Sequence, residues 1–305
     1  MKNISLGNTE IKASQIALGC MRLASLNYKE ADAVINTAMD NGINFFDHAD
    51  IYGGGRSEEI FGEILKNEKS LRNKIYIQSK CGIRSGYFDS SYEHIVTSCE
   101  GSLKRLNTDY LDVLLIHRPD ALCEPSEIAR AFEKLHSEGK VRYFGVSNHN
   151  SMQVELLQKY LRMPLIVNQL QLSVVHTGMI DEGICVNMKN QQSVMHDGSV
   201  LNYSRLNSMT VQAWSPLQYG MIEGSFMDNS NYEAINAELE KMAKEKGVEK
   251  NGLSIAWILR HPANIQAIIG CMNTTHIEQI CRASDLEFTR PEWYSIYRAA
   301  GNIIP

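Results

Sequence analysis

The sequence predicts an α/β fold, a closed (β/α)8 barrel, and three observations support this class. Eight short apolar runs of strand length alternate with longer amphipathic stretches, which is typical of repeated strand–helix units. No linker, internal repeat or low-complexity tract separates the units, so residues 1–305 are expected to form a single domain. The first apolar run leads into Gly19-Cys20-Met21 instead of the GxGxxG motif of an open doubly wound sheet.

A short hairpin is expected before the barrel. Residues that favour strands flank Gly7-Asn8 between Ile4 and Lys12, which predicts two paired strands that cap the fold. The barrel strands are then expected at Gln15–Leu18, Ile43–Asp47, Lys74–Ser79, Leu111–His117, Val141–Val146, Leu165–Gln169, Thr210–Trp214 and Ile265–Ile269.

The amphipathic stretches predict the helices, and capping residues mark several starts. Ser126 precedes a glutamate, Ser57 precedes two glutamates, and Asn150 or Ser151 could begin another helix. The helices are expected at Lys29–Asp40, Ser57–Lys66, Tyr92–Leu106, Ser126–Ser137, Tyr232–Lys246 and Leu253–Arg260, with a last helix, Arg290–Ala300, packing across the barrel. The connections Ser173–Gln192 and Gln218–Asn231 are long for this fold and are expected to determine substrate specificity.

Composition and charge favour a cytoplasmic protein that acts on a small molecule. Hydrophobic residues make up 44% and charged residues 21% of the chain, as in ordinary globular proteins. The net charge is −5 without long runs of one sign, which argues against nucleic-acid and membrane-surface partners. Seven scattered cysteines suggest free thiols in a reducing compartment. Neither a secretion signal nor a membrane-spanning stretch is apparent.

Four polar side chains follow predicted strands at the end where such barrels hold their active sites. Asp47 ends the second strand, Tyr52 lies five residues further on, Lys80 follows the third strand and His117 ends the fourth. Any one of them could be structural, but a lysine at the end of an apolar strand is costly to bury without a partner. The four together therefore predict a catalytic site.

This combination suits the protonation of a carbonyl oxygen as hydride reaches the carbon. Tyrosine, with a pKa near 10, is a weak acid at neutral pH, and a nearby ammonium lowers that pKa by stabilising the phenolate. Lys80 would supply this charge and Asp47 would fix the position of Lys80. His117 would donate a hydrogen bond to the substrate oxygen or share its proton with Tyr52.

The strings FFDHADIYGGG, IQSKCG, DVLLIHRPD, VRYFGVSNH, NQLQLS and AWSPL contain these residues and resemble the aldo-keto reductase superfamily. The resemblance extends over essentially the whole chain and is strongest to a bacterial branch of short-looped oxidoreductases. It implies a TIM barrel with an N-terminal hairpin and an extended nicotinamide cofactor across the barrel mouth. It also implies that the protein reduces small aldehydes or ketones.

The resemblance further implies a set of cofactor contacts. Ser147, Asn148 and Gln169 would bind the nicotinamide carboxamide, and Trp214 would stack on the ring. Ser215, Pro216 and Leu217 would enclose the pyrophosphate, with Gly220 nearby, and Gly19, Cys20, Met21, Arg22 and Asp47 would line the near side.

The adenosine end departs from the family pattern. Where family members commonly place cations, this chain has Gly270, Cys271 and Met272, followed by His276, Gln279 and Ile280. NADP(H) is still favoured from the family, and NAD(H) is possible, because a 2′-phosphate prefers strong cations.

Two other functions fit parts of the pattern. A metal-dependent barrel hydrolase would use Asp47, His48, Asp50 and His117, but Asp47 and His48 point to opposite faces of a strand, so no metal site is expected. A non-catalytic barrel could instead bind nicotinamide as a sensor or scaffold, although the intact catalytic set argues against it.

Overall fold

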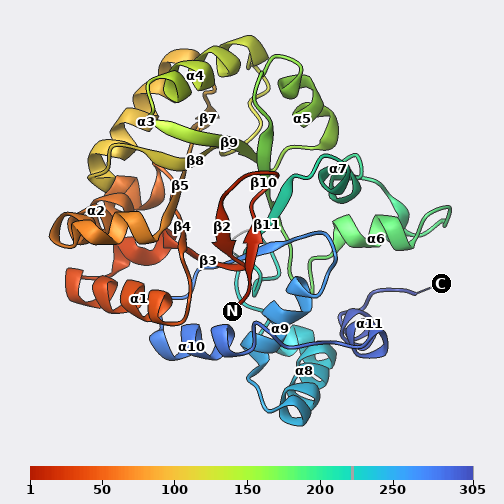
Figure 1. Ribbon diagram of the computed structural model, residues 1–305. Helices are drawn as coiled ribbons and strands as arrows, with labels where there is room; N and C mark the ends of the chain where they lie inside the picture. Colours follow the sequence, from red (N-terminus) through yellow and green to blue (C-terminus); the bar gives the residue numbers. More distant parts are fainter. Residues whose placement is uncertain (221–222, 305) are drawn as a thin grey trace.

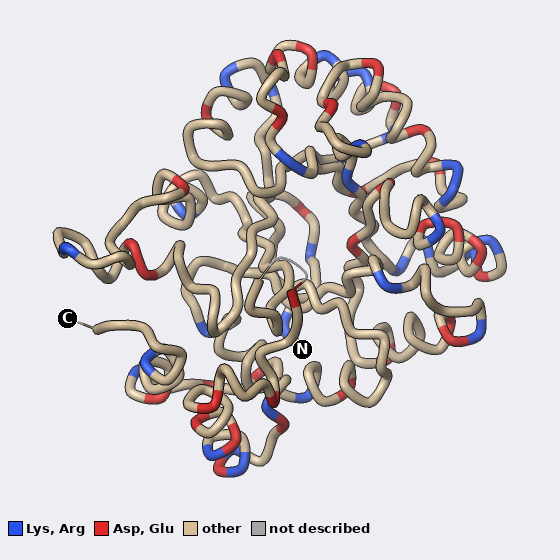
Figure 2. The backbone as a smooth tube through the Cα atoms, turned by 180° about the vertical axis from the view of Figure 1, so that it is seen from behind, with Lys and Arg blue, Asp and Glu red and all other residues tan. Residues whose placement is uncertain are grey.

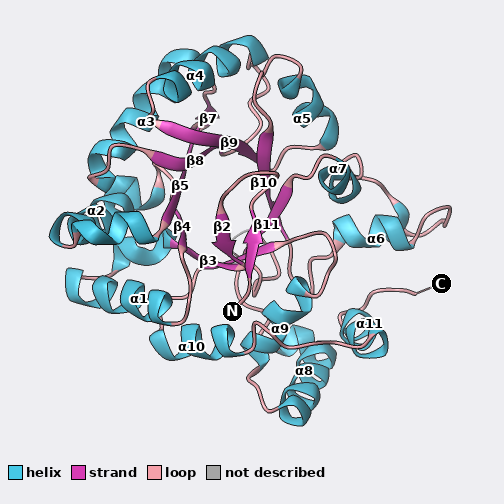
Figure 3. Cartoon of the chain, viewed as in Figure 1, coloured by secondary structure: helices cyan, strands magenta, loops and turns pink. Residues whose placement is uncertain are grey.

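The computed structural model describes residues 1–220 and 223–304 and forms the predicted barrel (Figure 1). Eight strands close in the order β3-β4-β5-β8-β9-β10-β11-β12, and β12 pairs with β3. All neighbours in the barrel are parallel, and helices surround it (Figure 3). Every predicted strand is confirmed: β3 Ile16–Gly19, β4 Phe45–Asp47, β5 Tyr76–Cys81, β8 Leu111–Ile116, β9 Val141–Ser147, β10 Leu165–Gln171, β11 Thr210–Trp214 and β12 Gln266–Ile269.

The predicted hairpin closes the N-terminal end of the barrel. Its strands, β1 (Asn3–Ser5) and β2 (Lys12–Ser14), pair antiparallel. In the turn, the Gly7 amide donates to Thr210 Oγ1 at the start of β11, over 2.8 Å. Gly7 has φ +57° and an added Cβ would lie 2.7 Å from Ile166 Cβ, so glycine is required there. One end of the barrel is therefore covered.

The helices begin where the capping residues predict them or within a few residues. In α1, for example, Asn27 accepts from the Glu30 amide and Glu30 reciprocates, which is a complete capping box. The predicted helices correspond to α1 Tyr28–Asp40, α2 Arg56–Asn67, α3 Tyr92–Leu106, α4 Pro125–Ser137, α8 Glu233–Lys246, α9 Lys250–Leu259 and α11 Arg290–Ala299.

Four helices lie outside the predicted ranges: α5 Ser151–Gln158, α6 Gly178–Ile184, α7 Val200–Leu206 and α10 Thr274–Arg282. These helices span two to three turns or fewer, too short for a clear apolar period. Helix α6 lies within the connection Ser173–Gln192, for which the sequence predicted no helix. The Asn150 cap that begins α5 was visible in the sequence, and its side chain accepts from the Gln153 amide.

The position predicted for the last helix was also wrong. Helix α11 packs beside α8 and α9 on the outside of the barrel (Figure 1), not across it. The Trp293 and Trp257 rings stack with centroids 4.5 Å apart, and each indole N–H donates to the other residue's backbone carbonyl. The apolar face of α11 is therefore already buried against neighbouring helices, so packing across the barrel would bury no further apolar surface.

The other long connection, Gln218–Asn231, is only partly described, because residues 221 and 222 lie outside the described residues. Its described part contains a bridge between Gln218 and Ser225. Acidic and basic residues are interspersed over the outer helices (Figure 2). None of the described helices is long and apolar enough to cross a membrane.

Candidate active site

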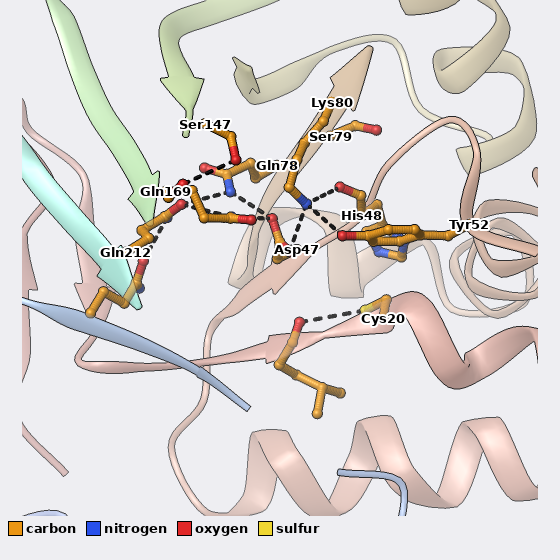
Figure 4. Close-up of polar contacts among 12 residues, drawn as sticks. Cys20, Asp47, His48, Tyr52, Gln78, Ser79, Lys80, Ser147, Gln169 and Gln212 are labelled. Carbon is orange, nitrogen blue, oxygen red and sulfur yellow. Dashed lines mark hydrogen bonds and ion pairs between the residues drawn. The ribbon is translucent and has the colours of Figure 1, made fainter. Parts of the chain in front are cut away.

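The active-site candidates meet at the C-terminal ends of adjacent barrel strands. In the register of β4 and β5, Asp47 lies opposite Gln78, and Lys80 follows two residues later on the same face of β5. The Lys80 ammonium is fully buried and donates to Asp47 Oδ2 over 2.8 Å and to Tyr52 Oη over 3.1 Å (Figure 4). Its third donor goes to the His48 carbonyl over 2.7 Å. Lys80 thus uses all three N–H groups.

Tyr52 reaches this position through the loop after β4. The loop turns through Gly53 and Gly54, which have φ values of 60° and 66°, and Gly55 is the N-cap residue of α2. An added Cβ on Gly53 would lie 2.3 Å from Ala24 Cβ. The glycines therefore allow the tight turn that directs Tyr52 toward Lys80.

His117 completes the predicted set. It follows β8, where its amide donates to the Cys81 carbonyl, and its ring lies edge-on to Tyr52 with centroids 5.9 Å apart. Its Nδ1 is buried and has no hydrogen-bond partner among the described residues. The sequence-predicted residues Asp47, Tyr52, Lys80 and His117 are thus brought together.

Burial determines the charge states more than the sequence suggested. Burial raises the pKa of Tyr52 above its ordinary value, and the Lys80 ammonium opposes this rise without reversing it. Lys80 therefore acts on the Tyr52 pKa in the predicted direction, but desolvation, which the sequence prediction left out, has the larger effect. Tyr52 holds its proton at neutral pH, as an acid must.

Lys80 is charged at neutral pH, whereas His117 is neutral. Burial disfavours the ammonium, but Asp47 and Tyr52 outweigh it and raise the pKa of Lys80. Burial, together with the charges of Lys80 and Arg118, holds the pKa of His117 well below its ordinary value. His117 is therefore a neutral imidazole beside a charged lysine, and it can donate one N–H.

The residues of the hydrolase alternative do not converge. The His48 ring points away from Asp47 and lies edge-on to Phe61, with centroids 4.6 Å apart. Asp50 turns toward α3, where it accepts from Ser98 Oγ over 2.6 Å. In the described part of the chain, no group of three or more His, Cys, Asp or Glu side chains is arranged to hold a metal ion.

A chain of glutamines supports Asp47 from inside the barrel. Gln78 and Gln169 each direct the side-chain NH2 to Asp47 Oδ1, over 2.6 and 3.0 Å, and to Gln212 Oε1, over 2.8 and 3.1 Å (Figure 4). Gln212 then donates to Gln266, which donates to the Ser14 carbonyl. Because a carboxylate and a carbonyl only accept, this chain fixes the orientation of each amide.

Sequence reasoning missed Gln78, Gln212 and Gln266. The alternation of a β-strand could have identified Gln78, because it lies two residues before Lys80 and so shares its face. This orientation of the Gln78 amide costs free energy, because Gln78 Oε1 is buried with no hydrogen-bond partner among the described residues. The position of this amide is therefore set by Asp47.

A cavity of about 980 Å³ opens above these residues. Trp214 lines it and donates from Nε1 to Asn148 Oδ1 over 3.1 Å, which orients both side chains. Arg22 donates to the Gly270 carbonyl over 3.1 Å at another part of the wall. The predicted cofactor residues that line the cavity are Gly19, Met21, Arg22, Asp47, Ser147, Asn148, Gln169, Trp214, Ser215, Pro216, Leu217 and Gly270.

Six predicted cofactor residues do not line the cavity: Cys20, Gly220, Met272, His276, Gln279 and Ile280. Cys20 and Ile280 are fully buried in the apolar core between barrel and helices. His276 is exposed on α10, and Gln279 accepts from Asn251 Nδ2 on α9. Helix α10 uses this side to pack against α9.

Other lining residues were not predicted. Arg118 and Pro119 directly follow His117, and their place after a barrel strand could have identified them. Ile51, Ile83 and Phe88 add an apolar wall, and the last two lie in the small hairpin of β6 (Ile83–Arg84) and β7 (Tyr87–Phe88). Such loop positions carry no periodic pattern.

Comparisons with known proteins show that this barrel is that of an oxidoreductase. The profile of the Aldo/keto reductase family matches residues 15–300, and the chain belongs to that family. The family uses a nicotinamide cofactor and acts on small carbonyl compounds.

Three similar proteins illustrate the relationship. The uncharacterized oxidoreductase YcsN of Bacillus subtilis is 36% identical, with 98% of each chain covered. A 6-dehydroglucose reductase of Agrobacterium fabrum is 34% identical, again with 98% of each chain covered. The crystal structure of an aldo/keto reductase from Klebsiella pneumoniae in complex with NADP and acetate matches with a TM-score of 0.78 and 25% identity, over 100% of this chain and 97% of that one.

Proposed function

We propose that the protein reduces an aldehyde or ketone to an alcohol with NAD(P)H, and that Tyr52 is the general acid. One observation carries this proposal: Lys80 Nζ lies 3.1 Å from Tyr52 Oη at the cavity that His117 also lines. A buried ammonium has little reason to contact a phenol unless the phenolate must be stabilised. The same contact argues against a non-catalytic sensor or scaffold.

The proton route follows from the charge states. Tyr52 gives its proton to the carbonyl oxygen, and the Lys80 ammonium stabilises the phenolate that remains. Asp47 keeps Lys80 charged and in place through the 2.8 Å contact. The neutral His117 ring orients the substrate oxygen by donating a hydrogen bond. Each side chain thus contributes before or during the proton transfer.

In this proposal the cavity holds the nicotinamide and pyrophosphate part of an extended dinucleotide. Ser147, Asn148 and Gln169 offer polar groups beside Asp47, and Trp214 offers an aromatic face. Ser215, Pro216, Leu217 and Arg22 would hold the phosphate-bearing part. The nicotinamide supplies the hydride when it is bound. These residues would orient it, which is most of what a protein adds to such a cofactor.

We favour NADP(H) over NAD(H). A structure with the same fold holds NADP, and Arg22 gives this chain a cation at the cavity wall. NAD(H) use is possible, since few cations surround the adenosine end of the predicted site.

The seven cysteines form no disulfide, and this supports a reducing, cytoplasmic location for a single-domain protein of residues 1–305.

The test is direct. The pure protein is titrated with NADPH and with NADH by cofactor fluorescence, and a panel of aldehydes and ketones is then assayed with the tighter one. We expect NADPH to bind more tightly and several carbonyl compounds to be reduced. Absence of both binding and turnover would reject the proposed function.

A further inference from the structure

The described side chains that line the cavity carry a net positive charge. Asp47 is the one acidic side chain among the described lining residues, and its ion pair with Lys80 neutralises it. Two arginines line the same cavity, Arg22 and Arg118. The chain as a whole carries a net charge of −5, so this positive character is local.

Arg118 occupies the part of the cavity that contains the catalytic candidates. It follows His117 in the chain, is partly buried, and its guanidinium carbon lies 5.8 Å from the centre of the Trp214 ring. Arg22 lies elsewhere, against the Gly270 carbonyl. The two arginines can therefore serve different anionic groups.

Part of the cavity wall is apolar. Pro119 follows Arg118 in the chain, and Ile51, Ile83 and Phe88 line the same cavity, where Phe88 and Ile51 remain exposed by 45% and 39%. A ligand with an apolar body would bury this surface, since exposed apolar groups at a cavity mouth favour apolar contact. A small polyhydroxylated substrate would leave its hydroxyl groups without partners against these side chains.

We propose that the substrate is a carbonyl compound with an apolar, ring-sized body and a carboxylate that Arg118 binds. The planar guanidinium has five N–H donors in a fork that fits a carboxylate with two parallel hydrogen bonds. Partial burial strengthens such a contact relative to water. The proposal rests on the proposed reductase function, because it assigns the substrate of that same cavity.

The experiment compares two aldehydes that differ in this charge and in one methyl group: 4-carboxybenzaldehyde and its methyl ester. Wild-type protein is expected to reduce the acid with a kcat/KM about 10-fold to 100-fold above that of the ester, because charge-assisted hydrogen bonds contribute this much. The difference should lie mainly in KM, since the carboxylate is remote from the reacting carbon.

Variants assign the preference to one residue. Arg118→Met should bring the two kcat/KM values to within about 2-fold of each other, and Arg118→Lys should give an intermediate ratio because it keeps the charge without the fork. Arg84→Met is the matched control: it removes the same charge from the exposed hairpin, and Arg84 does not line this cavity. Its acid-to-ester ratio should equal that of wild type.

A binding measurement keeps the test independent of turnover. In the presence of saturating NADPH, which cannot accept a hydride from an alcohol, calorimetry compares 4-(hydroxymethyl)benzoate with its methyl ester, and we expect tighter binding of the benzoate only when Arg118 is present. Equal rates and equal affinities for the charged and neutral compounds would overturn the carboxylate assignment while the reductase function stood. A protein that binds the benzoate through Arg118 but reduces neither aldehyde would instead contradict the proposed function alone.

Discussion

The Lys80 ammonium lies 3.1 Å from the Tyr52 hydroxyl oxygen and 2.8 Å from Asp47 Oδ2, so one buried cation contacts both an acid and its counter-ion. Tyr52→Phe removes the transferable proton and leaves the ring in place. We expect kcat to fall by about 10²- to 10⁴-fold, the usual contribution of a general acid. Cofactor binding, followed by fluorescence, should change by less than about 2-fold. Wild-type rates in this variant would rule out Tyr52 as the acid.

Lys80→Met tests the origin of the acidity. The ammonium lowers the pKa of Tyr52 against the larger effect of burial, so its removal raises that pKa further. Reduction needs protonated Tyr52, and its rate falls as pH rises through the Tyr52 pKa. The basic limb of the kcat profile should therefore move to higher pH while the maximum rate drops. A profile with the limb unmoved would contradict the role of Lys80.

The same variant should be less stable. Asp47 is 2% exposed, and loss of Lys80 leaves its carboxylate buried without a cation. We expect a loss of about 3–5 kcal/mol in the free energy of unfolding, measured with urea. The double variant with Asp47→Asn should recover part of this loss, because no unpaired charge remains. If the double variant is less stable than Lys80→Met, the pair is not coupled in this way.

Gln78→Met tests the support of Asp47. The substitution keeps the size of the side chain and removes the 2.6 Å donor to Asp47 Oδ1. We expect kcat to fall by about 10-fold, because a hydrogen bond to a charged group contributes roughly 1.5–3 kcal/mol. Gln15→Met is the control: Gln15 is also buried, and its amide donates to the Ser284 carbonyl far from the cavity. Similar stability losses with a rate effect only in Gln78→Met would identify a positioning role.

Features that depend on residues close together in the sequence could be predicted, whereas features that depend on contacts between distant strands could not. The eight strands could be predicted because a short apolar run indicates a buried strand without reference to distant parts of the chain. Lys80 could be identified because a charged residue at the end of such a run needs a partner. Helices α6 and α7 have seven residues each, too few for a period to appear. The glutamine chain joins β4, β5, β10, β11 and β12, and only closure of the barrel brings those residues together.

The electrostatic outcome was harder to predict than the geometry. The sequence placed a cation beside Tyr52 but gave no measure of how far both side chains are removed from water. Desolvation is a property of the whole surrounding structure, and here it exceeds the effect of Lys80 on the Tyr52 pKa. The apolar wall residues Ile83 and Phe88 were missed for a similar reason, since loop residues show no pattern that marks them as lining a cavity.

His48 should make the fold sensitive to acid. It is fully buried, neither ring nitrogen has a partner among the described residues, and burial lowers its pKa to about 3. The unfolded chain takes up this proton near pH 6.5, whereas the folded protein resists it. Stability is therefore fully present above pH 6.5 and is lost progressively as pH falls toward 3.

His48→Leu should remove that part of the acid sensitivity. We expect the unfolding free energy of the variant to fall less than that of wild type between neutral pH and about pH 4, by roughly 2–3 kcal/mol. His196→Leu, at an exposed position, should follow the wild-type curve. Parallel curves for wild type and His48→Leu would show that His48 is not the responsible group.

The shared acceptors of Gln78 and Gln169 have a consequence for anyone who redesigns this barrel. Both amides donate to the same two oxygens, on Asp47 and Gln212, so each can compensate in part for the loss of the other. Substitutions at these positions should then be strongly non-additive, and a double-mutant cycle would register the excess. A mutant library of this barrel should therefore vary Asp47, Gln78, Gln169 and Gln212 together or leave all four unchanged.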